Sequence, residues 1–84
     1  MIGFGEAIRA LKSGQRVARA GWNGKGMWLR LIPAGEWSIP NLSLEPGTIL
    51  PLLPWIGMRT AGGEFVPWLA SQTDILAVDW TVSP

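Results

Sequence analysis

The sequence predicts an α+β fold, in which a small antiparallel sheet is packed by an N-terminal helix and a short C-terminal helix, with a proline-rich apolar arm. Three observations lead to this class. An apolar pattern of helical period opens the chain, alternating segments follow it, and a capping pattern near the C-terminus marks a second helix. The 84 residues match a single domain, 1–84, with a small core.

The first element is a helix predicted over residues 4–13, FGEAIRALKS. Phe4, Ile8 and Leu11 recur at helical spacing, so they share one face that we expect to lie against the core. Gly14 supplies the stop, because glycine readily adopts the backbone conformation that ends a helix.

Two strands are predicted next, over residues 16–22 (RVARAGW) and 27–32 (MWLRLI), because their residues alternate between two faces. The glycine-rich loop between them joins the strands as a hairpin. We expect this hairpin to bring Trp22 and Trp28 close together at one end of the sheet. Met27 falls on the apolar face of the second strand and is expected in the core.

The middle of the chain, residues 33–54, is expected to form an extended apolar arm. Its five prolines exclude a helix and a central strand, because proline fixes φ and has no N–H to donate. An apolar arm on so small a domain favours burial by another subunit over exposure to water. We therefore expect a homo-oligomer in which the arm takes part.

The C-terminal part predicts a hairpin, a short helix and a last strand. Residues 55–68 alternate around a Gly-Gly turn, which is typical of a hairpin. The SQTD sequence from Ser71 to Asp74 has capping-box spacing, with Asp in place of the usual Glu, and opens the helix. Residues 77–82, AVDWTV, form the last strand, in which Trp80 is expected to pack rather than to bind a ligand.

The composition excludes several function classes. The chain has no histidine and no cysteine, so the usual zinc, copper and iron sites and Ser-His-Asp or Cys-His catalysis lack their groups. We expect no metal and no cofactor. A net charge of +1 argues against polymeric nucleic acid as a partner, because binding its many phosphates requires many lysine and arginine side chains. No apolar run is long enough for a bilayer and no secretion signal is visible, so we expect a cytoplasmic protein without membrane contact.

The stretch RAGWNGKGMWL, residues 19–29, is a candidate site for a small anionic ring. Tryptophan can stack on a base, and glycine lets the backbone approach a ligand. Arg19, Lys25 or the nearby Arg30 can pair with phosphate. Asn23 and Asp74 can hydrogen-bond ribose hydroxyls or a base edge. The structural alternatives stay open, since the glycines can serve only a turn and Asp74 can serve only as a helix cap.

Two segments together carry a family resemblance. FGEAIRALKSGQRVARAGWNGKGMWL and TAGGEFVPWLASQTDILAVDW resemble the second type of Thoeris anti-defence protein, a family of small phage proteins first described as a domain of unknown function. The motifs GWNGKGM and PWLASQTDILA.DW are specific in combination. The resemblance covers nearly the whole chain.

The resemblance implies a binding protein rather than an enzyme. Family members sequester a cyclic nucleotide signal of the host's immune system, best associated with glyco-cyclic ADP-ribose, and some also take cyclic oligonucleotides from a second defence system. The resemblance also implies a homotetramer with pockets between subunits, in the cytoplasm of the infected cell. The candidate ligand-binding residues are Arg19, Trp22, Asn23, Gly24, Lys25, Met27, Trp28, Trp68, Ser71, Gln72, Thr73 and Asp74.

Two functions from other classes are the alternatives. A structural or assembly protein would use the apolar arm to join subunits. A nucleotide hydrolase would need two carboxylates as acid and base, and no two acidic residues stand in an obvious catalytic pairing in the sequence.

Overall fold

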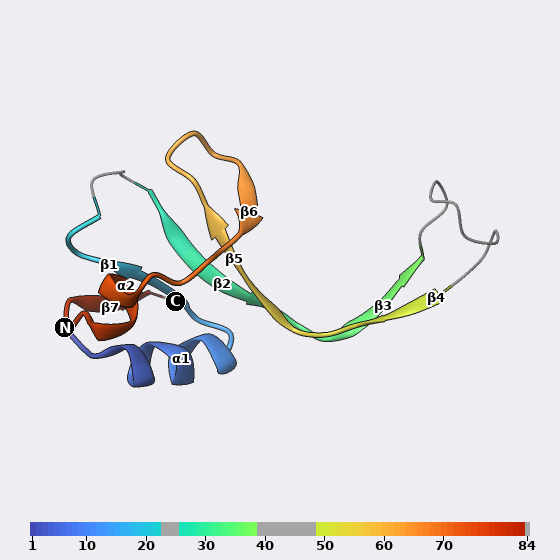
Figure 1. The fold of residues 1–84 in the computed structure, drawn as a ribbon, viewed down its shortest axis with the longest axis horizontal. Coiled ribbons are helices and arrows are strands. Elements are labelled where there is room, and N and C mark those ends of the chain that lie inside the picture. Colours follow the sequence, from blue (N-terminus) through green and yellow to red (C-terminus); the bar gives the residue numbers. More distant parts are fainter. Residues whose placement is uncertain (23–25, 39–48, 84) are drawn as a thin grey trace.

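The computed structural model describes residues 1–22, 26–38 and 49–83. A five-stranded antiparallel sheet has the order β6-β5-β2-β1-β7, and β3 and β4 form a separate two-stranded ribbon (Figure 1). The predicted α+β class is therefore confirmed. The elements are α1 (Phe4–Lys12), β1 (Arg16–Arg19), β2 (Trp28–Ile32), β3 (Gly35–Ser38), β4 (Ile49–Leu52), β5 (Trp55–Arg59), β6 (Phe65–Pro67), α2 (Gln72–Leu76) and β7 (Trp80–Ser83).

Helix α1 forms where the apolar spacing predicts it, and its buried face carries Ala7 and Leu11. The helix ends in a Schellman motif. The N–H of Gly14 donates to the carbonyl oxygen of Leu11, and the N–H of Gln15 donates to that of Ala10. Gly14 has a φ of 89°, a conformation that glycine adopts without strain, so the predicted stop is confirmed.

The core lies between α1 and one face of the sheet. Five fully buried side chains form it: Ala7, Leu11, Val17, Leu29 and Trp80. Helix α1 contacts β1, β2 and β7, and α2 contacts α1 on the same side of the sheet. Both helices thus cover one face of the sheet, and no helix in the described part of the chain covers the other face.

Trp80 is the largest of the fully buried side chains. Its ring lies 5.4 Å from that of Phe4 and 5.5 Å from that of Trp22, and its Nε1–H donates to the carbonyl oxygen of Asp74. The backbone of Trp80 also exchanges two hydrogen bonds with Ile2. Trp80 is therefore a packing residue, as predicted, and it joins both chain ends to the core.

The predicted hairpins are confirmed, in one case with shorter strands. Strand β1 pairs with β2 through Val17 and Leu29, but β1 ends at Arg19 instead of reaching Trp22. Strands β5 and β6 pair around a turn in which Gly63 has a φ of 92°. The last strand begins at Trp80, later than the sequence pattern suggests.

The expectation that Trp22 and Trp28 lie together is wrong. Trp22 packs edge-on against Trp80 on the core side. Trp28 precedes the buried Leu29 in β2, so its side chain points to the opposite face, where its ring lies 6.1 Å from that of Phe65. The alternation of β2 accounts for the separation, because Trp28 stands next to the buried Leu29 and so lies on the face opposite the core.

The middle segment contains two strands that the proline content did not predict. Strands β3 and β4 pair antiparallel and extend the β2–β5 pair away from the five-stranded sheet (Figure 1). The register of Ile32 with Trp55 continues in that of Gly35 with Leu52, which places Pro33 opposite Pro54. Both prolines lack an N–H, so the ladder is interrupted where the ribbon leaves the sheet. We call this ribbon, β3 and β4, the arm.

Prolines confine strands to sheet edges, and both arm strands are edge strands. The prediction of no helix and no central strand in this segment therefore holds for its described part. Residues 39–48, at the end of the arm, lie outside the described residues. No helix in the described part of the chain is long and apolar enough to cross a membrane.

Candidate functional site

One group of predicted site residues meets at the end of β1 and the start of α2. Arg19 donates from Nε to Oδ1 of Asp79 at 2.8 Å and from Nη1 to Oδ1 of Asp74 at 2.9 Å. The second oxygen of Asp79 accepts the N–H of Gly21 at 2.9 Å, and Asp74 Oδ1 also accepts the Nε1–H of Trp22 at 3.5 Å. We call Arg19, Trp22, Asp74 and Asp79 the Arg19 cluster. The cluster joins the residues at the end of β1 to helix α2 through Asp74 and to the start of β7 through Asp79.

The Arg19 cluster carries one positive and two negative charges. The hydrogen bonds that Arg19 donates to Asp79 and Asp74 raise the pKa of Arg19 above its ordinary value. Partial burial raises the pKa of Asp74, but hydrogen bonds from Arg19, Ser71 and Trp22 outweigh burial and leave it lowered. The hydrogen bond from Arg19 likewise lowers the pKa of Asp79. The charge of Arg19 is thus compensated within the protein, which leaves the cluster a poor partner for a phosphate.

The Arg19 cluster predicts a loss of stability in acid. Both carboxylates have a folded-state pKa below their ordinary 3.8, so their contribution is present above that pH and is lost as the pH falls through the folded-state values. Asp79→Asn removes one of them. We expect its melting temperature to fall less than the parent's between about pH 5 and about pH 3, as measured by circular dichroism.

The matched control for this acid test is Glu6→Gln, which neutralises an exposed carboxylate of α1. This variant should follow the parent curve. An Asp79→Asn curve parallel to the parent's would mean that the Arg19–Asp79 ion pair contributes nothing to the pH dependence of folding.

The second group lies on the face of the sheet that no helix covers. Trp28 pairs with Arg59 and Arg59 pairs with Phe65, so these three side chains share a face across three strands. Arg30 follows on β2, and the guanidinium of Arg16 lies 5.0 Å from the centre of the Trp28 ring. With Trp55, whose ring lies 5.9 Å from that of Phe65, these residues make up what we call the outer face: Arg16, Trp28, Arg30, Trp55, Arg59 and Phe65.

A glycine allows the rings of the outer face to lie close to the sheet. A Cβ added to Gly57 would stand 2.2 Å from the ring of Phe65 and 3.1 Å from that of Trp55. The Phe65 ring therefore lies directly over the glycine, a known way of covering a bare backbone position in a sheet. Phe65 nevertheless keeps 44% of its surface exposed, so the ring remains available for contact.

The remaining predicted site residues are dispersed. Trp68 is half-buried, with its ring 6.0 Å from that of Phe4 and 6.1 Å from that of Trp80. Met27 is half-buried just before β2. The Ser71 hydroxyl caps α2 by accepting the N–H of Asp74 at 3.1 Å, which confirms the predicted cap. Two further residues, Gln72 and Thr73, are exposed in the first turn of α2, and Asn23, Gly24 and Lys25 lie outside the described residues.

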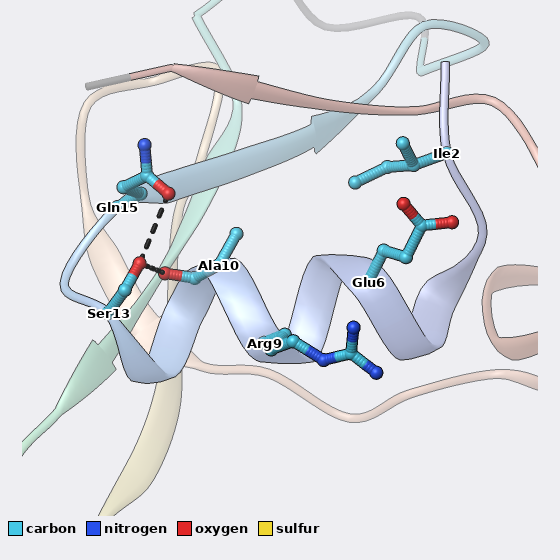
Figure 2. A pocket seen from close by; sticks show the side chains of 6 residues that line it. All are labelled: Ile2, Glu6, Arg9, Ala10, Ser13 and Gln15. Atoms are coloured by element: carbon cyan, nitrogen blue, oxygen red, sulfur yellow. Dashed lines mark hydrogen bonds between the residues drawn. The ribbon is translucent and has the colours of Figure 1, made fainter.

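A shallow depression of about 340 Å³ lies elsewhere, along α1 (Figure 2). Glu6 and Arg9 flank it on the helix, and Ser13 donates to Gln15 at one end. Among the described residues, neither an aromatic ring nor a predicted ligand-binding residue lines it, so we do not assign the site there.

The sequence did not identify Asp79, Arg16, Arg59 or Phe65 as site residues. Asp79 precedes Trp80 within a predicted strand, where a carboxylate is typical of a solvent-facing position. The other three become neighbours of Trp28 only through pairing across strands. Alternation gives a usable signal, since Trp28 and Arg30 stand two positions apart in a predicted strand and therefore fall on one face. Among the described residues, no three carboxylates lie close enough together to hold a metal ion.

The comparisons with known proteins agree with each other. Residues 2–83 match the family model described as the Thoeris anti-defense 2-like domain. The chain is also 37% identical over 89 residues to a protein of Bacillus phage SP01 named Thoeris anti-defense 2, and the match covers 96% of this chain and 93% of that protein.

Proposed function

The chain belongs to the Thoeris anti-defense 2-like family, and we propose that it counters host defence by binding and sequestering a cyclic nucleotide immune signal without cleaving it. The proposed ligand is glyco-cyclic ADP-ribose, and the proposed range extends to cyclic oligonucleotides of a second defence system. The proposed active form is a homotetramer in the cytoplasm of the infected cell. The resemblance described above suggests ligand and assembly; the family name itself supports an anti-defence role.

The observation that carries the proposal is the chemistry of the outer face. It offers aromatic rings for a base and arginines for a pyrophosphate, the two parts that a cyclic ADP-ribose presents. Stacking contributes about 1–3 kcal/mol per base, and bidentate arginine contacts with phosphate are among the strong hydrogen bonds in proteins. A sequestering protein must compete for the signal with the host protein that the signal activates. A nanomolar Kd corresponds to a binding free energy of about 12 kcal/mol, so several such contacts have to act together.

Binding without turnover is favoured over hydrolysis by the state of the carboxylates. Arg19 donates to both Asp74 and Asp79, and hydrogen bonds leave the pKa of each carboxylate lowered. A general acid needs a pKa raised toward neutrality. Neither residue therefore has the raised pKa that would favour it as a proton donor.

The experiment that separates sequestration from cleavage is recovery of the ligand. The purified protein is loaded with glyco-cyclic ADP-ribose, freed of excess ligand, heated to denature it, and the supernatant is analysed by chromatography and mass spectrometry. We expect the intact cyclic nucleotide in an amount that matches the bound sites. A linear or hydrolysed product that is absent from a protein-free control would establish an enzyme instead.

A second candidate function, an assembly protein, is favoured by one observation. The arm projects from the sheet as a ribbon of two edge strands, and an isolated two-stranded ribbon is only marginally stable in water. Contact with another subunit would stabilise it. Assembly through the arm is also compatible with a nucleotide-sequestering protein whose pockets lie between subunits. Nucleotide binding, rather than assembly, is therefore the property that distinguishes the two functions.

A further inference from the structure

We propose that the outer face of one subunit receives the arm of a second copy of this chain, and that the exchange is reciprocal, so that two chains cover each other's outer faces. This inference rests on the homo-oligomer of the proposed function and names the two surfaces that meet in it. It is carried by the complementary charge of the two surfaces, by their apolar side chains and by the direction in which the arm leaves the sheet.

The outer face is positively charged. Its strand positions include Arg16, Arg30 and Arg59, and no Asp or Glu occupies any of them among the described residues. Arg30 and Arg59 donate to backbone carbonyl oxygens, and neither pairs with a carboxylate in the described part of the chain. Glu64, in the turn between β5 and β6, hydrogen-bonds with Thr60. The face is therefore suited to a partner surface that brings carboxylates.

The segment that carries the arm has the opposite charge. Residues 33–54 contain Glu36, which lies in β3, and Glu45, and they contain no lysine or arginine. The segment also offers apolar area, since Leu53 is 79% exposed and Pro54 beside it is exposed. An acidic and apolar segment is the complement of a face made of arginines and aromatic rings, the side chains that are enriched in protein interfaces.

The arm is directed away from the outer face of its own chain. The register of Ile32 with Trp55 continues in that of Gly35 with Leu52, so the arm prolongs the β2–β5 pair beyond the sheet (Figure 1). The molecule measures 47 × 26 × 25 Å along its principal axes, and the arm accounts for the long axis. An arm that covers an outer face must therefore come from another chain. Direct contact between two outer faces is disfavoured, because it would bring their arginines together.

A two-fold axis between two chains would form the contact twice. The arm of each subunit would lie over the outer face of the other, which is the self-complementary contact of an isologous dimer. The arm strands have four residues each and β2 and β5 have five, which corresponds to lengths of about 13 Å and about 16 Å. The arm thus matches the outer face in length. Such a contact is compatible with pockets between the subunits of the proposed homotetramer.

The test reverses one charge on each surface and measures subunit association by sedimentation velocity over a range of protein concentrations. Arg30→Glu changes the outer face, and Glu36→Arg changes the arm. Either variant alone sets like charges against each other, so its association should be at least about 10-fold weaker than the parent's. In an equimolar mixture of the two variants, each arm can again meet a face of opposite charge. Association in the mixture should return to within about 3-fold of the parent.

The matched control is Arg9→Glu, the same reversal at an exposed arginine of α1, on the other side of the sheet. It should associate like the parent. Circular dichroism shows whether each variant is folded. If Arg30→Glu does not fold, Arg30→Gln takes its place, and it should associate at least about 3-fold more weakly than the parent.

The outcomes separate this inference from the proposed function. Undiminished association of folded Arg30→Glu, or a mixture that associates no better than its two components, would overturn the inference. A monomeric parent would also overturn it, and sequestration would still stand if that monomer binds glyco-cyclic ADP-ribose in calorimetry. Recovery of association in the mixture by a protein that binds no nucleotide would support the inference and refute the proposed function.

Discussion

Trp80→Ala is expected to lower the free energy of unfolding by about 3–5 kcal/mol, the usual cost of truncating a fully buried tryptophan. The side chain has no exposed surface, and it contacts Phe4, Trp22 and Trp68. The substitution also removes the hydrogen bond from Nε1 to Asp74. Domains typically have only about 5–15 kcal/mol of stability, so the variant should lose a large fraction of it. Urea denaturation followed by circular dichroism measures the effect.

Two further variants show whether the cost at Trp80 comes from burial. Trp80→Phe keeps a ring against Phe4 but loses the N–H, and it should fall between the parent and Trp80→Ala. Trp28→Ala removes a tryptophan from the partly exposed outer face and should cost clearly less. Equal losses at positions 80 and 28 would contradict the placement of the core on one side of the sheet.

Replacing residues 33–54 by an Asn-Gly turn is expected to abolish assembly and leave the five-stranded sheet folded. Ile32 and Trp55 are register partners, so a two-residue turn can close β2 and β5 into an ordinary hairpin. None of the arm side chains that the structure describes belongs to the buried core. Multi-angle light scattering should show the mass of one chain for this variant and that of an oligomer for the parent.

The circular dichroism spectrum serves as the control for this replacement, because a retained transition shows that the sheet still folds. A point variant, Leu53→Ser, gives an independent reading, since Leu53 is 79% exposed beside the break in the ribbon. It should weaken assembly without removing any strand. If the variant without the arm contains as many subunits as an oligomeric parent, the subunits meet elsewhere.

Local patterns predicted most of the fold. The helix of residues 4–13, the two hairpins, the Ser71 cap and the stop at Gly14 each follow from a spacing or a residue type within a few positions. The arm strands were missed because their proline content points away from strands, whereas an edge strand tolerates a proline such as Pro51. The pairing that defines the arm depends on residues far apart in the sequence.

The candidate site was only partly predictable, because its contacts also depend on residues that are far apart in the sequence. Sequence proximity placed Trp22 and Trp28 together, but the parity of β2 sends Trp28 to the other face. The sequence also offered Arg19 as a phosphate partner, and no local pattern showed that Asp79, from the far end of the chain, pairs with it. Residue types near the motif were informative about chemistry, while the geometry came from strand register.

The measurement that tests sequestration most directly is isothermal titration calorimetry of the purified protein with glyco-cyclic ADP-ribose. We expect saturable binding with a submicromolar Kd, roughly 8 kcal/mol or more of binding free energy, and a fixed number of sites per oligomer. Absence of binding to this nucleotide and to a panel of cyclic oligonucleotides, by a protein that circular dichroism shows to be folded, would contradict sequestration and leave assembly through the arm as the better description.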